Sequence, residues 1–401
     1  MATLTLVFPP LPYLINHYSK GNTTLYTAQL GKDGGASVTL KLTAVLTSFL
    51  EPFPAEITQA ESQLVRFTVS HWFLSPYLTE SQKTTIKLAS RAVESYTKRA
   101  PQALTGSTLT YGPYKDVAPW AFSPATVHSV NNKPFAKFSS INREIEVSHW
   151  GNVAIEETYE LKHAGARLAG GFSRFDYKAG RSADSPSFRS LTALLPSQAR
   201  DIYYRDQIGN ISTSDLRKLD AGLEMEIQTR YPMFGGWQSQ FYIGYNVPSE
   251  TMLFVDSVTG RHNLKVDYFV PFDDVWVEDM EIKIVLPEGC SDVKIDLPYV
   301  VEKQTWTTRF TYLDSVFNGG RKVLTLKASN LVEEFDKKVI VSYSFSRSRM
   351  LFEPLLLCAV FFFLFCACSL FARLNTVLEG KEGKEGKEGK EGKEGKKSKS
   401  E

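Results

Sequence analysis

The sequence predicts a mainly β protein in which two antiparallel, β-sandwich-like domains are followed by one transmembrane helix. Apolar residues recur at every second position in several segments, most clearly at residues 223–228 (LEMEIQ) and 281–286 (EIKIVL). Such alternation is typical of strands with one buried and one solvated face. Proline and glycine interrupt these segments at short intervals, as at Pro232, Pro248 and Gly289. Short strands between turns favour sandwiches, and a long apolar run near the C-terminus supplies the helix.

The chain is long enough for two domains ahead of the apolar run, because a domain holds about 150 residues on average. Residues 111–124 are rich in Tyr, Gly and Pro and predict a loop. We therefore expect a first β domain at residues 1–118 and a second at 119–350. Within the first domain, residues 80–98 fit either a strand or a helix.

The apolar run extends from Leu355 to Ala372, 18 residues without a charge. At about 1.5 Å per residue it is roughly 27 Å long, close to the thickness of a bilayer core. A helix buried in a protein core is the alternative, but only Glu-Gly-Lys repeats follow the run. We predict a transmembrane helix at residues 351–373 and a disordered, charged tail at 374–401, because the repeats have no apolar side chain to bury.

Basic residues near the two ends of the span predict its orientation. Arg373 and a series of lysines follow the span, whereas only Arg347 and Arg349 precede it closely. Because cytosolic flanks are the more basic, the tail is expected in the cytosol and both β domains in a lumen or outside the cell. Lys397 and Lys399 have the spacing of a dilysine retrieval signal for the endoplasmic reticulum, although a lysine-rich tail produces this spacing readily by chance.

Two sequons agree with a lumenal location, Asn210-Ile211-Ser212 and the weaker Asn22-Thr23-Thr24. Asn210 follows Ile208-Gly209, which predicts an exposed turn. The cysteine count is also informative, because Cys290 is the only cysteine ahead of the span. No disulfide can form within the β domains, so they depend on ordinary hydrophobic cores.

Composition excludes some functions. Hydrophobic residues make up 43%, charged residues 22%, and the net charge is +2. No basic patch interleaved with aromatic residues occurs before the tail, so we expect no nucleic-acid partner. The sequence also lacks catalytic motifs, a phosphate-binding glycine loop and Cys/His metal spacing. We therefore predict no catalytic residue, no cofactor and no bound metal.

Two groups of residues could still bind a ligand. The segment Arg200–Asp206 (RDIYYRD) could bind a polar ligand such as a sugar, but Arg–Asp pairs at a sheet edge with packed tyrosines explain it more simply. Trp150, Trp237, Trp276 and Trp306 could form a platform for stacking on a sugar, but core packing is the commoner role of such residues.

A series of distinctive segments occurs in a fixed order along the chain. They are KLASR (87–91), VESYTK (93–98), HWGN (149–152), YYRDQIGN (203–210), YPMFGGW (231–237), GYNVPS (244–249), LPEG (286–289), TYLD (311–314) and EPL (353–355). Through them the chain resembles the ribophorin I family, subunit 1 of the oligosaccharyltransferase, over roughly residues 38–373.

The resemblance implies a single-pass type I protein of the endoplasmic reticulum membrane. In that family the protein is a non-catalytic subunit of the complex that transfers a preassembled glycan from dolichyl diphosphate to Asn of Asn-x-Ser/Thr in nascent proteins. Catalysis and its divalent metal belong to a different subunit. The partners implied are the other subunits of the complex, including the catalytic one, nascent polypeptides and the lipid bilayer. The implied role is that of a scaffold that presents substrates.

The chain departs from the family at both ends. Members begin with a cleavable signal peptide and a fuller first domain, whereas residues 1–10 (MATLTLVFPP) have no basic region and only a very short apolar stretch. We therefore expect the first domain to be truncated at its N-terminus. The Glu-Gly-Lys tail is not a family feature.

Two other functions are compatible with the residues alone. One is a cell-surface adhesion or receptor ectodomain, whose glycans would resist endoglycosidase H after passage through the Golgi. The other is a membrane-anchored enzyme that uses the segment Arg200–Asp206, in which case Asp206→Ala would abolish activity without affecting assembly.

Overall fold

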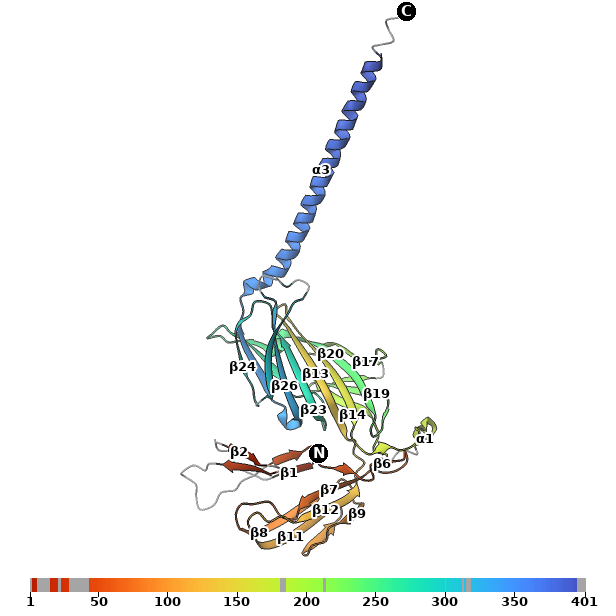
Figure 1. Cartoon of the computed structure of the whole chain (residues 1–401), viewed down its shortest axis with the longest axis vertical. Coiled ribbons are helices and arrows are strands. Elements are labelled where there is room, and N and C mark those ends of the chain that lie inside the picture. Colours follow the sequence, from red (N-terminus) through yellow and green to blue (C-terminus); the bar gives the residue numbers. More distant parts are fainter. Residues whose placement is uncertain are drawn as a thin grey trace, which may run out of the picture.

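A computed structural model of the chain describes residues 43–180, 185–211, 214–299, 301–311, 314 and 319–394, together with short strands at residues 2–5, 15–20 and 23–28. Figure 1 shows three parts along one long axis: a small β domain, a larger β domain, and the long helix α3, which leaves the larger domain at the end far from the small one. The predicted mainly β fold with one C-terminal apolar helix is confirmed.

The first domain consists of two small sheets packed face to face. Tyr111 and Leu109 from one sheet and Ala125 and Val127 from the other are fully buried between them. The first sheet has the strand order β5 (Glu51–Pro52), β7 (Leu64–Ser70), β12 (Pro124–Val130), β9 (Val93–Tyr96). The second sheet has the order β10 (Gln102–Thr105), β11 (Thr108–Val117), β8 (Thr79–Lys87).

Strand pairing shifts the division between the two domains along the chain from the predicted position at residues 118 and 119. Strand β12 pairs with β7 and β9 and so belongs to the first domain, and the next strand, which starts at Ala136, belongs to the second. A loop-like composition at 111–124 did not locate the division, because β11 extends into it and pairs with β8. The ambiguous residues 80–98 form the strands β8 and β9, without a helix.

The second domain is a larger sandwich built on one seven-stranded sheet. Inward-facing residues such as Ile141 and Ile155 of that sheet pack against Ile227 and Val341 of two smaller sheets that cover its inner face. The strand order is β17 (Arg200–Asp206), β20 (Gln238–Pro248), β14 (Asn152–His163), β13 (Ala136–Ser148), β23 (Trp276–Val285), β26 (Arg321–Leu331), β25 (Lys303–Arg309). One covering sheet has the strand order β16 (Phe188–Leu195), β19 (Leu223–Met233), β18 (Asp215–Lys218). The other has the order β21 (Leu253–Val255), β22 (His262–Asp267), β27 (Lys338–Ser344), β24 (Ser291–Asp296).

Most strand pairs are antiparallel, but the central pair β13–β23 is parallel. A parallel pair needs a long crossover connection, and here the connection contains the strands from β14 to β22. The sheet is therefore assembled from segments far apart in sequence.

The remaining elements are short strands and helices. They are β1 (Ala2–Thr5), which pairs with β4 (Thr43–Leu46); β2 (Ile15–Lys20), which pairs with β3 (Thr23–Ala28); β6 (Glu56–Ile57), which pairs in parallel with β15 (Arg167–Leu168); α1 (Arg174–Lys178), α2 (Ser249–Met252), η2 (Glu333–Phe335), η3 (Arg347–Leu351) and α3 (Phe352–Glu394).

A buried glutamine joins the two domains. Gln63, of the first domain, is fully buried; its Nε2 donates to the carbonyl of Asn131 at 2.9 Å, and its Oε1 accepts from the backbone N–H of Ala166 at 2.8 Å. A Cβ on Gly165 would lie 2.2 Å from that Oε1. Any larger residue at this position would therefore push the Gln63 side chain away and break its hydrogen bond to Ala166. Together with the β6–β15 pair, this contact connects the domains through backbone groups on both sides.

Helix α3 contains the predicted membrane span and extends beyond it. Within Arg347–Arg373, the most apolar 18-residue window has a mean hydropathy of 2.7, and none of that window is buried in the rest of the chain. The tail predicted at residues 374–401 continues α3 as far as Glu394, while residues 395–401 lie outside the described part. The repeat contains no proline, and a Glu follows four residues after each of Lys381, Lys384, Lys387 and Lys390, a spacing that suits a helix.

An ion pair lies inside the second sandwich. Arg143 and Glu157 face each other across β13 and β14 at core positions, with their side chains 5% and 0% exposed and 2.5 Å between Nε and Oε1. The Tyr159 hydroxyl donates to Glu157 Oε2, and Arg143 Nη1 donates to the carbonyl of Asp267 in the covering sheet at 2.8 Å. The ion pair is therefore hydrogen-bonded to both layers of the sandwich.

Removing one charge of this pair should destabilise the second domain strongly. Glu157→Gln leaves the Arg143 guanidinium buried without its counter-charge, and we expect the free energy of unfolding to fall by about 3–5 kcal/mol. Chemical denaturation of the full chain in detergent, followed by fluorescence, measures this loss.

The exposed pair of Arg66 with Glu51 supplies the control, because its side chains are 44% and 69% exposed. Glu51→Gln should change stability by less than about 1 kcal/mol. Equal effects of the two substitutions would contradict a structural role for the buried pair.

Candidate functional site

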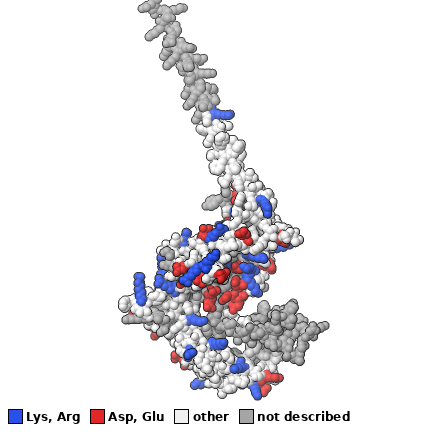
Figure 2. All heavy atoms as spheres, turned by 180° about the vertical axis from the view of Figure 1, so that it is seen from behind, with Lys and Arg blue, Asp and Glu red and all other residues white. Residues whose placement is uncertain are grey.

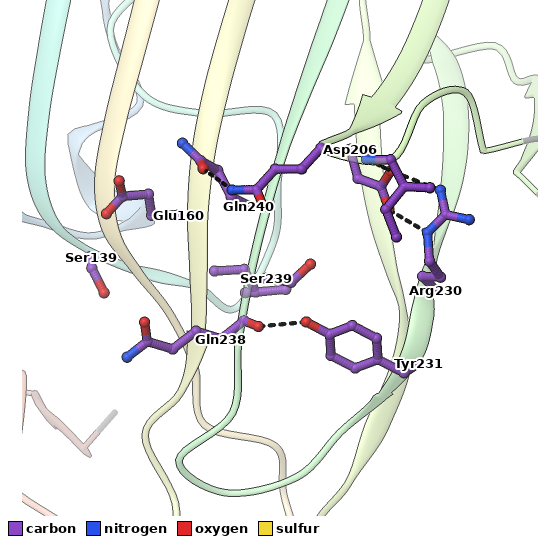
Figure 3. A pocket seen from close by; sticks show the side chains of 11 residues that line it. Ser139, Glu160, Asp206, Arg230, Tyr231, Gln238, Ser239 and Gln240 are labelled. Atoms are coloured by element: carbon purple, nitrogen blue, oxygen red, sulfur yellow. Dashed lines mark hydrogen bonds and ion pairs between the residues drawn. The ribbon is translucent and has the colours of Figure 1, made fainter.

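A polar pocket of about 350 Å³ opens where β14, β19 and β20 meet the turn after β17. In Figure 3, Ser139 and Glu160 lie on one side of it and Arg230 and Tyr231 on the other, with Gln240 between them. The Tyr231 hydroxyl donates to the carbonyl of Gln238 at 2.7 Å. Amide, hydroxyl and carboxylate groups dominate the lining, so the pocket is suited to hydrogen bonding with a polar ligand.

One of the two carboxylates that line this pocket, Asp206, is already paired. Asp206 accepts from Arg230 Nε at 2.5 Å and Nη2 at 2.7 Å, and from the backbone N–H groups of Ile208 and Gly209. The hydrogen bond from Arg230 lowers the pKa of Asp206, partial burial opposes this, and the two backbone donors lower the pKa further. A carboxylate held in this way stabilises the turn and is a poor general base.

The segment Arg200–Asp206 forms the edge strand β17, where its tyrosines pack and its charges pair. Tyr204 is buried in the core, while the Tyr203 hydroxyl donates to Glu156 at 2.6 Å. Asp206 pairs with Arg230 from another strand, and Arg205 Nε donates to Asn210 Oδ1 at 2.6 Å. These contacts agree with the simpler interpretation of the segment, a sheet edge.

The stronger glycosylation candidate, Asn210, lies on the surface beside this pocket. It is exposed and follows the turn closed by the Asp206–Gly209 backbone hydrogen bonds, where Gly209 has φ +140°. An acceptor in such a turn would be accessible to a modifying enzyme. The other sequence candidates, Asn22, Lys397 and Lys399, lie outside the described residues.

The four tryptophans do not form a platform. Trp237 packs among Phe172, Tyr231 and Phe234, and Trp276 donates to Asn330 Oδ1 at 2.9 Å while Lys137 lies over its ring. The expectation of core packing is wrong for Trp150 and Trp306, which are 59% and 43% exposed. No ring contact joins two tryptophans within the part of the chain that the structure describes.

A second pocket, of about 450 Å³, lies between the layers of the second domain near the buried ion pair. Its lining includes Arg143, Tyr245, Lys265 and Asp267. Burial raises the pKa of Tyr245 strongly, and the charge of Glu157 raises it further, so this phenol stays neutral. The charge of Arg143 is balanced by that of Glu157, a pair that the sequence analysis missed. The sequence did contain a sign of this pair, because Arg143 and Glu157 occupy inward-facing positions of strands whose other inward-facing residues are mostly apolar.

Histidine and acidic side chains gather at opposite ends of the second domain. Near α3, the rings of His149 and His262 are 4.7 Å apart, and burial, then His262, lowers the pKa of His149 to about 4. At the end near the first domain, burial and then Asp273 and Asp274 raise the pKa of Glu333. Figure 2 shows acidic side chains gathered on this part of the second domain. Among the described residues, no group of three or more His, Cys, Asp or Glu is placed to hold a metal ion.

An apolar patch on the first domain was not anticipated from the sequence. Phe73, Tyr77, Leu78, Trp120 and Phe122 are between 48% and 77% exposed. The backbone N–H of Trp120 donates to the carbonyl of Ser75 at 2.8 Å, so the two segments that carry the patch lie side by side. Large exposed apolar side chains brought together in this way are typical of a protein–protein contact.

Comparison with known proteins identifies related chains. A family model described as ribophorin I matches residues 13–372. Dolichyl-diphosphooligosaccharide–protein glycosyltransferase subunit 1A of Arabidopsis thaliana is 41% identical over 353 residues, which cover 87% of this chain and 56% of that protein. Subunit 1B of the same plant is 44% identical over 83% of this chain and 71% of its own length.

Subunit 1 of Caenorhabditis elegans is 41% identical over 85% of this chain and 58% of its own length. The chain therefore spans little more than half of the plant subunit 1A and of the nematode subunit. Among solved structures, native yeast LTA4 hydrolase has a TM-score of 0.32 at 11% identity, covering 53% of this chain and 29% of that one. A TM-score at this level does not indicate a common fold.

The Asp206–Arg230 pair should make the stability of the second domain depend on pH. Because the folded-state pKa of Asp206 is lowered, its contribution is present above the unfolded pKa, about 3.9, and is lost as pH falls through the folded value. Asp206→Asn should therefore lower the melting temperature at neutral pH, and the difference from wild type should shrink as pH falls below about 4.

Melting curves of the full chain in detergent across this pH range test it. Asp220→Asn, which removes an exposed carboxylate from a different turn, is the matched control and should follow wild type at each pH. A wild-type advantage over Asp206→Asn that persists unchanged in acid would refute the assignment.

Proposed function

The chain belongs to the ribophorin I family, and we propose that it is a non-catalytic subunit of the oligosaccharyltransferase complex of the endoplasmic reticulum. This proposal is supported chiefly by the match of the family model to residues 13–372 and by relatives named as subunit 1 of this glycosyltransferase. The complex would transfer a preassembled glycan from dolichyl diphosphate to Asn of Asn-x-Ser/Thr in nascent proteins, and this chain would act as a scaffold.

The accessory role is supported by how the reactive side chains are used. Asp206 is paired with Arg230 in the polar pocket, and Glu157 is paired with Arg143 in the core. Each carboxylate is engaged in holding strands or turns together, as expected for a structural subunit.

We also propose a type I orientation, with both β domains in the lumen and the end of α3 in the cytosol. Basic residues of the Glu-Gly-Lys repeat follow the apolar stretch in greater number than those before it, which supports this direction. Figure 2 shows the apolar stretch of α3 as a segment without charged side chains that ends at a basic residue. Exposure of Asn210 on the second domain is compatible with a glycan acceptor in the lumen.

The apolar patch of the first domain is the surface that we assign to contact with another subunit of the complex. Its five large side chains lie on the domain farthest from α3, so the bilayer cannot cover them. Nascent polypeptides would approach the second domain, where the polar pocket offers hydrogen-bonding groups.

Glycosylation of Asn210 tests the orientation and the compartment together. In cells, the chain should carry an endoglycosidase H-sensitive glycan, and Ser212→Ala should remove it because the sequon needs the hydroxyl residue. Gel mobility before and after digestion measures this.

Thr213→Ala is the matched control, since Thr213 adjoins the sequon without belonging to it. A glycan that resists the enzyme would indicate passage through the Golgi and would support a cell-surface function. A chain without any glycan at Asn210 would contradict the lumenal assignment of this surface.

Membership of the complex should depend on the apolar patch. The full chain should co-migrate with the catalytic subunit on native gels in mild detergent, and Tyr77→Asp with Phe122→Asp should reduce co-purification several-fold. Depletion of the chain should leave a subset of glycoproteins under-glycosylated.

Val258→Asp introduces the same charge at a side chain that is also exposed, on the second domain, and should leave the association intact. A chain that migrates as a monomer, in cells whose glycosylation is normal after depletion, would rule out the proposed function.

A further inference from the structure

We propose that the second domain rests on the bilayer surface through an aromatic collar around the base of α3, formed by Trp150, Phe310, Leu351 and Phe352. This contact with lipid goes beyond the proposed function, because it requires neither another subunit nor a glycan. It concerns how the domain is held relative to the membrane. The collar is assembled from three separate stretches of sequence that meet where the helix begins.

Trp150 is held beside the chain that enters α3. It lies in the turn between β13 and β14, and its neighbour His149 stacks on Phe345 with 3.9 Å between ring centroids and 5° between ring planes. His149 Nε2 is also 3.2 Å from the hydroxyl of Tyr343. Because Phe345 directly precedes the segment that leads into α3, these contacts place the 59% exposed indole near the base of the helix.

Phe310 reaches the helix base by a different route. Its ring packs against Gly320, where an added Cβ would lie 3.0 Å away, and Gly320 adjoins Arg321. Arg321 binds Glu146 of β13 at 2.8 Å and Glu353 in the first turn of α3 at 3.3 Å. Phe310, which is 55% exposed, therefore lies beside the neighbour of a residue that is bound to α3 itself.

The connection between domain and helix is too short to lift the domain away. The 3-10 helix η3 (Arg347–Leu351) has five residues, which at about 2 Å per residue is roughly 10 Å. Gly289, with φ +76°, lets the side chain of Arg349 pack against the domain, since a Cβ there would lie 3.0 Å from Nη1. A collar at the base of α3 must then lie close to the plane where the apolar stretch enters the bilayer.

The chemistry of the collar matches the headgroup region. Tryptophan is enriched at membrane interfaces, where its indole leaves water while its N–H stays hydrated, and apolar side chains such as Phe and Leu are buried at the same boundary. Arg347 is exposed in the same stretch and carries a charge of the sign that lipid phosphates attract. The partner of the collar is lipid, because the collar is continuous with the apolar surface of α3. That surface begins beside Leu351 and Phe352, both about half exposed.

Quenching of tryptophan fluorescence by brominated lipid tests the collar. The full chain is reconstituted alone in phosphatidylcholine vesicles whose acyl chains carry bromine either near the headgroup or near the chain end. Headgroup-proximal bromine should quench part of the wild-type emission, and Trp150→Phe should remove most of that quenching. Bromine near the chain end should quench Trp150 less.

Trp120→Phe is the matched control, because Trp120 is 49% exposed on the domain farthest from α3 and should not contribute to the quenching. Unchanged melting temperatures would verify that both variants fold. Equal quenching of wild type and Trp150→Phe would overturn the proposal. The same holds if an aqueous quencher reaches Trp150 in vesicles as freely as in the chain unfolded by denaturant, since the indole would then face water. Either result leaves complex membership untouched, so the two proposals fail separately.

Discussion

The second domain depends on the buried contact between Arg143 and Glu157. The pair joins the two strands at the middle of the seven-stranded sheet, and Arg143 reaches across the sandwich to the carbonyl of Asp267 in the covering sheet. A charge pair without water is costly unless its hydrogen bonds are satisfied, so the surrounding strands are restricted to the register that satisfies them. This restriction fixes the relation between strands that are far apart in the sequence.

A sandwich held in this way gives fixed positions to the surfaces that function requires. The turn with Asn210 is stabilised by Asp206 and Arg230, the apolar patch lies on the distal domain, and the base of α3 is tied to the sheet through Arg321. Gln63 connects the two domains through backbone groups. The arrangement agrees with the proposed accessory role, because these ionised side chains stabilise the fold.

Several features could be predicted from the sequence because they depend on local pattern. Alternation at residues 223–228 and 281–286 marked the strands β19 and β23, and the apolar run at 355–372 marked the membrane-spanning part of α3. The turn before Asn210 was likewise evident from Ile208-Gly209. The division between the domains was placed too early, because a loop-like composition carries no information about which sheet β12 joins.

What the sequence determined by itself was the class of the strongly patterned elements, the membrane anchor and the family, since these follow from periodicity, hydropathy and short motifs. The tertiary structure alone decided which distant residues meet. The parallel β13–β23 pair, the hydrogen bond from Arg143 to the carbonyl of Asp267 and the collar of Trp150, Phe310 and Phe352 all join segments separated by more than the reach of a local pattern. The physical reason is that a side chain's burial and charge partner depend on the face against which its strand packs, and strand pairing between distant segments sets that face.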